Sequence, residues 1–141
     1  MTSTNTRPIT LCIALAGAVA LAAACSKNQP DAAAQARPLV FKPQESIPVS
    51  LTLQKAEGQS GRTSPISTNY RPQVRFAPAP EELSCKVELP AATPSLEPGQ
   101  TSPAVLSCDA EARVEPAKRE FAVLEGGKQV GHGVVELPSG K

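Results

Sequence analysis

Four cysteines are the residues of this 141-residue chain with the most distinctive chemistry. Cys25 ends the run Leu21-Ala22-Ala23-Ala24-Cys25, which closes an uncharged apolar segment, and the sequence becomes polar immediately after it. A cysteine at such a junction is typical of covalent lipid attachment. Cys12 lies within the apolar segment, whereas Cys85 and Cys108 lie far downstream and remain available for pairing with each other.

Residues 1–24 have the composition of a cleaved bacterial lipoprotein signal peptide. Arg7 and the α-amino group give a positive start, and the segment from Ile9 to Leu21 is uncharged and dominated by Ala, Leu, Ile and Val. The apolar stretch up to Ala24 is shorter than the ~20 residues that span a bilayer. An uncleaved anchor and secretion without a lipid are the alternatives. We expect cleavage after Ala24 and lipidation of Cys25, which anchors the protein to a membrane.

The residue after the cysteine predicts which membrane that is. Ser26 stands where signals for inner-membrane retention usually carry Asp. We therefore expect a lipid anchor in the outer membrane, with the protein facing the periplasm.

Charge and cysteine content limit what the mature chain can bind. Removal of residues 1–24 leaves 117 residues (141 − 24), enough for one domain, with 13 basic residues (14 less Arg7) against 13 acidic ones. This balance argues against nucleic-acid binding. Cys85 and Cys108 should form a disulfide in an oxidising compartment, a free buried pair being the alternative. His132 is the only histidine, so neither a metal site nor a cofactor is predicted.

The rest of the sequence alternates between apolar and polar residues, as half-buried strands do. Residues 25–38, rich in Ser, Asn, Gln, Pro and Ala, are expected to form the lipidated cysteine and a flexible tether, and residues 39–141 to form the folded domain. The 15 prolines and the short strands predict an all-β fold, either a closed antiparallel barrel or a small sandwich. The expected strands cover Ile47 to Gln54, Tyr70 to Phe76, Cys85 to Leu89, Ala104 to Cys108, and a hairpin of Phe121 to Leu124 and Val130 to Leu137, with loops at Ala56 to Ser64 and Pro94 to Pro103.

Three motifs in order resemble the third, C-terminal β-barrel domain of elongation factor Tu. They are Gly61-Arg62-Thr63-Ser64-Pro65 leading into Tyr70-Arg71-Pro72-Gln73-Val74-Arg75-Phe76, then Val87-Glu88-Leu89-Pro90 with Glu97-Pro98-Gly99, then the stretch from Phe121 to Val135 around Glu125-Gly126-Gly127-Lys128. The resemblance covers Leu39 to Leu137. It implies a small six-stranded antiparallel barrel.

The resemblance also implies a candidate interaction surface. Arg62, Arg71, Glu125 and Gly126 match family residues near the T-stem of aminoacyl-tRNA, and Gln73 and Arg75 extend the polar stripe that Arg71 begins. Thr63 and Leu124, however, replace a His and an Arg of the family pattern. The chain also has no phosphate-binding loop, so no nucleotide partner is expected, and binding of tRNA is only a remote alternative.

The expected function is therefore that of an envelope-anchored lipoprotein whose barrel is a non-enzymatic interaction or structural module. The alternative is a ligand-binding or adhesive role through the Arg71 and Arg75 face, toward an envelope protein or ligand. Catalysis has little support, because a nucleophile–base pair needs a histidine or two converging carboxylates: His132 is the only histidine, and Glu81-Glu82 lie in a proline-flanked loop.

Overall fold

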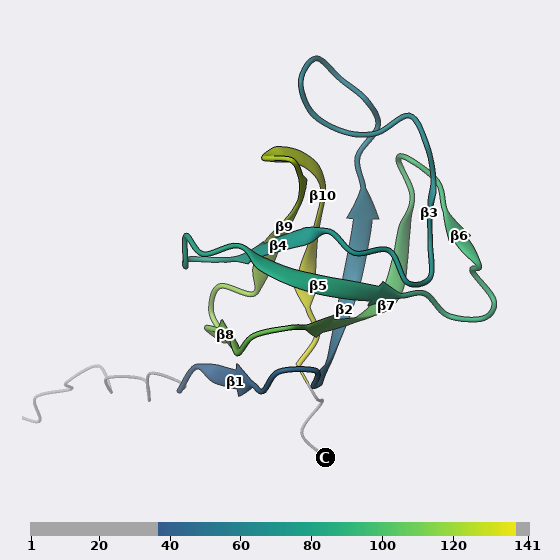
Figure 1. Cartoon of the computed structure of the whole chain (residues 1–141). Coiled ribbons are helices and arrows are strands. Elements are labelled where there is room, and N and C mark those ends of the chain that lie inside the picture. Colours follow the sequence, from purple (N-terminus) through teal and green to yellow (C-terminus); the bar gives the residue numbers. More distant parts are fainter. Residues whose placement is uncertain (1–36, 138–141) are drawn as a thin grey trace, which may run out of the picture. The chain divides into compact units, whose positions relative to one another are not determined.

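All regular structure in the described part of the chain is β-strand. The computed structural model describes residues 37–137 and contains ten strands in that range (Figure 1). They are β1 (Leu39–Phe41), β2 (Ser46–Leu53), β3 (Ile66–Ser67), β4 (Gln73–Phe76), β5 (Leu83–Glu88), β6 (Ser95–Leu96), β7 (Thr101–Cys108), β8 (Ala112–Val114), β9 (Glu120–Glu125) and β10 (Lys128–Val135).

Six of these strands close into an antiparallel barrel in the order β10-β2-β7-β5-β4-β9. They correspond to the six strands that the alternating pattern predicts, so the fold class and the strand number are confirmed. Two short pairs, β1 with β8 and β3 with β6, lie outside the barrel. Closure pairs β10 with β2 and leaves the barrel without a free sheet edge.

The barrel interior is filled by the apolar residues of the alternating pattern. In β2, Ile47, Val49, Leu51 and Leu53 are buried, whereas the intervening residues are exposed or half-buried. Phe76 and Phe121 meet in the core with their ring centroids 5.8 Å apart. Burying one such side chain contributes about 1.5–3 kcal/mol.

The predicted hairpin of β9 and β10 is confirmed, and its turn depends on glycine. Gly126 and Gly127 have φ values of 56° and 79°, the left-handed conformations that a tight two-residue turn requires. A bulge between Gln129 and Gly131 shifts the register of β10. As a result Val130 is buried, whereas His132 further along the strand is exposed.

The predicted loop from Pro94 to Pro103 is only partly correct. It contains β6, and β7 already begins at Thr101, so that Pro103 lies within a barrel strand. Proline is tolerated there because the last partner pair of β5 and β7 is Glu88 with Val105, which leaves Pro103 without a β5 neighbour to receive an N–H. Pro48 occupies an equivalent position on β2, one residue beyond the last β10 partner, Val49. The β1–β8 and β3–β6 pairs are too short to be found from alternation.

Candidate interaction surface

The structure divides the six predicted surface residues into two groups. Arg62, Glu125 and Gly126 lie where the β2–β3 connection meets the β9–β10 turn. Arg71, Gln73 and Arg75 lie along β4 and the residues before it, and all three are exposed. Within residues 37–137, no ion pair joins one group to the other.

Arg62 and Glu125 form an ion pair, and Tyr70 forms hydrogen bonds with both residues. The Arg62 guanidinium contacts a Glu125 carboxylate oxygen and donates to the Tyr70 hydroxyl at 3.3 Å, while that hydroxyl donates to the same carboxylate. The guanidinium carbon also lies 5.2 Å from the centroid of the Tyr70 ring, a cation–π distance. The Arg62 side chain is only 19% exposed, and its charge is paired with Glu125 within the protein.

The surroundings of Tyr70 strongly favour its neutral form. Burial, the hydrogen bond to Glu125 and the negative charge of Glu125 all raise the pKa of Tyr70 well above its usual value, and the nearby Arg62 offsets only part of this. The phenol therefore acts as a hydrogen-bond donor at any physiological pH. It is unsuited to act as a general base.

The loop that carries Arg62 is fixed by its backbone. The Gly61 N–H donates to the Gln129 carbonyl at 2.8 Å, and the Arg62 N–H donates to the Gln54 carbonyl at 2.9 Å. Gly61 has a φ of 74°, and a Cβ atom at this position would lie 1.9 Å from the Lys55 carbonyl oxygen. Only glycine allows this approach, so the loop is held against the β9–β10 hairpin.

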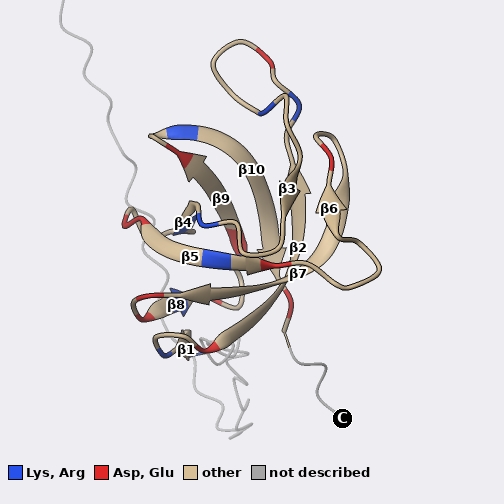
Figure 2. Cartoon of the chain, turned by 45° about the vertical axis from the view of Figure 1, so that its right-hand side comes forward, with Lys and Arg blue, Asp and Glu red and all other residues tan. Residues whose placement is uncertain are grey.

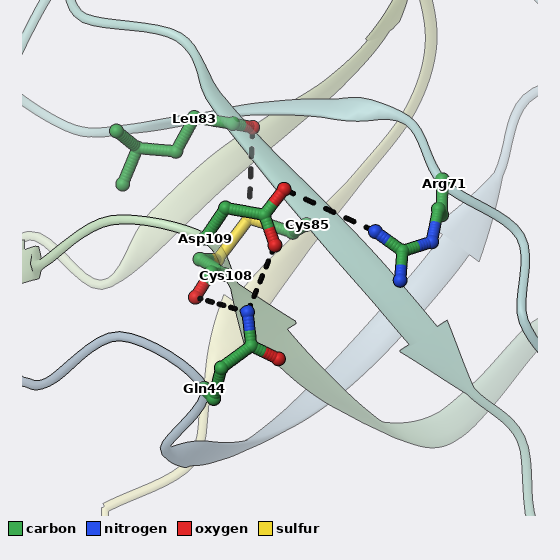
Figure 3. The surroundings of a disulfide bond; sticks show 6 residues. All are labelled: Gln44, Arg71, Leu83, Cys85, Cys108 and Asp109. Atoms are coloured by element: carbon green, nitrogen blue, oxygen red, sulfur yellow. Dashed lines mark hydrogen bonds and ion pairs between the residues drawn. A yellow bond between two sulfur atoms is a disulfide. The ribbon is translucent and has the colours of Figure 1, made fainter.

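Arg71 belongs to a polar group beside the disulfide, as Figure 3 shows. Its guanidinium lies 3.9 Å from an Asp109 carboxylate oxygen, and the Gln44 side-chain amide donates to the other Asp109 oxygen at 2.8 Å. The Gln44 N–H also donates to the Cys108 carbonyl at 2.8 Å. Since the Arg71 side chain is 60% exposed and its pairing distance is long, this arginine can exchange Asp109 for another anion.

The predicted disulfide between Cys85 and Cys108 is present. The two cysteines are directly opposite each other on β5 and β7, and both are buried in the core. Their backbone groups bond elsewhere, to Pro72 and Gln44, so they form a non-hydrogen-bonded pair, in which side chains lie closest. The covalent bond therefore joins two barrel strands 23 residues apart in sequence.

Arg75 lies beside a hollow on the outer surface of the barrel. It pairs with Glu82, and the hollow of about 420 Å³ is lined by Arg75, Ala122 and His132, which follow one another across β4, β9 and β10. The small Ala122 side chain between two long polar ones creates the depression. Gln73 makes no side-chain hydrogen bond to another described residue.

Neither a metal-binding cluster nor a membrane-spanning helix is found among the described residues. Within residues 37–137, no three His, Cys, Asp or Glu side chains are placed to hold a metal ion. No described helix is long and apolar enough to cross a membrane. Cys25 lies outside the described residues, so its predicted lipidation is not addressed by the structure.

No known protein-family model matches this chain. The residues that sequence reasoning missed are the partners of the predicted ones, namely Tyr70, Glu82 and Asp109. Tyr70 was visible as the first residue of the Tyr70-Arg71-Pro72-Gln73 motif, yet its contact with Glu125 spans 55 positions and has no local signal.

Proposed function

We propose that this chain is an envelope-anchored lipoprotein whose barrel, similar to the third domain of elongation factor Tu, is a non-enzymatic interaction module. The disulfide inside the barrel is the observation that carries this proposal. Disulfides persist in oxidising compartments, which agrees with the export that the Cys25 junction predicts. The first strand, β1, begins at Leu39, 14 residues after Cys25 (39 − 25), so even a fully extended tether would keep the start of the folded domain within roughly 50 Å of the lipid.

The arrangement of charges supports protein or ligand binding over translation. Arg62 and Glu125 neutralise each other in a half-buried cluster, and RNA binding there would have to disrupt it. Arg71 and Arg75 are more exposed and are paired with Asp109 and Glu82. The proposed interaction surface is therefore the β4 side, where Gln73 and the two arginines are presented together.

A second candidate is the binding of a small ligand on the same side of the barrel. The hollow beside Arg75 and His132 favours it, because about 420 Å³ lies within the range of small-molecule sites. Arg75 would then contact the ligand directly, and binding would need no protein partner.

The lipid anchor is tested by replacing the acceptor. Cells producing the Cys25→Ser protein should incorporate no radiolabelled palmitate into it, whereas the unmodified protein should be labelled and should partition with the outer-membrane fraction. Persistent labelling of the variant would contradict the anchor.

The interaction surface is tested with two matched double variants of the mature lipoprotein. Arg71→Ala/Arg75→Ala removes two cations from the β4 side, and Lys42→Ala/Arg113→Ala removes two from the region of β1 and β8. Chemical cross-linking in intact cells should give a product that only the first variant loses. Equal cross-linking by both variants would exclude this surface, and binding of a purified small ligand without any protein product would favour the second candidate.

A further inference from the structure

A second hollow lies on the outer surface over β2 and β7. It has a volume of about 370 Å³, and most of its lining is apolar, with Pro48, Pro90, Pro103, Leu89 and Val105 contributing. In the barrel order, β7 and β5 separate β2 from β4. This groove is therefore distinct from the surface that carries Arg71 and Arg75, and the inference below does not depend on the proposed function.

The ends of the neighbouring strands create the groove. The register of β5 against β7 ends at Glu88 with Val105, and the register of β10 against β2 ends at Val135 with Val49. Beyond these pairs β2 and β7 each carry a proline: Pro48 lies beside Glu136, just past the end of β10, and Pro103 lies past the last partner pair of β5 and β7. Proline rings give this floor a fixed apolar surface without N–H donors.

The backbone of the groove offers few groups for pairing with another strand. The Pro48 carbonyl accepts a hydrogen bond from the Glu136 N–H at 2.8 Å, and the Pro103 carbonyl accepts one from the Ser102 hydroxyl at 2.9 Å. With each of these carbonyls already accepting one hydrogen bond and the proline N–H donors absent, a ligand is recognised mainly through side chains. Binding by β-strand addition is therefore disfavoured at this surface.

The two ionisable residues in the groove lining are both acidic. Glu88, Val105 and Pro48 follow one another across β5, β7 and β2, and Glu136 adjoins Pro48 through its backbone hydrogen bond. The apolar centre is thus flanked by two acidic residues whose backbone positions are about 14 Å apart, which is three strand spacings of about 4.8 Å. Figure 2 shows acidic positions at the end of β5 and just before the grey C-terminal trace.

The Glu88 carboxylate remains available to a ligand. It pairs with Lys86 at 2.7 Å, but its side chain is 46% exposed and Lys86 does not line the groove. A carboxylate has two oxygens and can accept from a second cation at the same time. Glu136 is exposed and makes no ion pair with a described residue.

We propose that this groove binds an extended peptide segment of a partner protein, with two basic side chains flanking apolar residues. In an extended or polyproline conformation, basic residues four positions apart are separated by about 12–13 Å along the backbone, close to the backbone separation of Glu88 and Glu136. The apolar residues between them would rest on the proline floor. The charges would fix the position and the apolar contact would supply the affinity.

Three short peptides test this proposal on the full mature lipoprotein in detergent. The fluorescently labelled probe is acetyl-Lys-Leu-Pro-Leu-Lys-amide, and its controls are acetyl-Glu-Leu-Pro-Leu-Glu-amide and acetyl-Lys-Ser-Gly-Ser-Lys-amide. Fluorescence anisotropy should show saturable binding of the first peptide only, weakening as salt is added. Amide NMR shifts should locate it at β2, the end of β5 and β7.

Matched variants identify the carboxylates that bind. Glu88→Gln and Glu136→Gln should each raise the dissociation constant about two- to fivefold, as loss of an exposed ion pair does. Glu57→Gln in the β2–β3 loop should leave it unchanged. Unchanged thermal unfolding would show that the variants remain folded. No saturable binding of the first peptide, equal binding of the controls, or equal affinity in all three variants would each overturn the proposal.

Discussion

Tyr70 links two residues that sequence reasoning had assigned to an external partner. Its hydroxyl lies between the Arg62 guanidinium and the Glu125 carboxylate, and its ring lies beneath the guanidinium. An arginine and a glutamate read from a motif can thus serve the protein itself. Buried charges need such partners, because an unpaired one would be costly.

The raised pKa of Tyr70 makes stability depend on pH in the alkaline range. The folded state holds the phenol proton more tightly than the unfolded chain, where tyrosine titrates near pH ~10. This contribution is fully present below pH ~10 and is lost as the pH rises toward the higher pKa of the folded protein. Urea unfolding should therefore show a free energy of unfolding that falls above pH ~10, and Tyr70→Phe should remove that part of the fall.

Titration of the phenol gives an independent reading. Tyr70 is the only tyrosine and the chain has no tryptophan, so phenolate ultraviolet absorbance reports this residue alone. The folded protein should titrate above the urea-unfolded protein. Coincident titration curves would contradict the proposed environment.

At the scale of elements, the β9–β10 hairpin shows close packing that a glycine permits. A Cβ atom at Gly133 would lie 2.3 Å from the Ser50 carbonyl oxygen and 2.4 Å from the Phe121 ring. We expect Gly133→Ala to lower the free energy of unfolding by about 1–3 kcal/mol, because the core must shift to accept the methyl group. Val134→Ala, on the outer face of the same strand, should cost much less, and equal losses in urea unfolding would refute the packing argument.

The alternation of apolar and polar residues made the barrel strands predictable, whereas contacts between residues far apart in the sequence could not be predicted. Ile47 to Leu53 and Phe121 to Val135 were found because one face of each strand is buried, and Gly126-Gly127 specifies its turn locally. Pro103 was assigned to a loop, whereas its position beyond the end of β5 allows a proline within a barrel strand. Likewise Arg62 and Arg71 were selected together, yet their separate partners depend on contacts across the barrel that no local pattern contains.

At the scale of the whole molecule, two features hold the barrel together: the closed ring of hydrogen-bonded strands and the disulfide. The hydrogen-bonded ring of six strands has a small core, and Cys85–Cys108 adds a covalent link between β5 and β7 inside it. In the unfolded chain this bond closes a loop between two cysteines that are 23 residues apart in sequence. The loop reduces the number of conformations of the unfolded chain, so less conformational entropy is lost on folding. A small domain gains stability from such a link without enlarging its core.

Reduction of the disulfide should therefore lower the free energy of unfolding by about 3 kcal/mol, the chain-entropy value for a loop of this length. Urea unfolding of the protein with and without reductant measures this difference, since the side chains in the core are otherwise unchanged. The Cys85→Ala/Cys108→Ala protein is the control, because its stability should not respond to reductant. If reductant left the unmodified protein as stable as before, while thiol titration showed both cysteines free, the disulfide would have no stabilising role and the packing of the barrel alone would account for its stability.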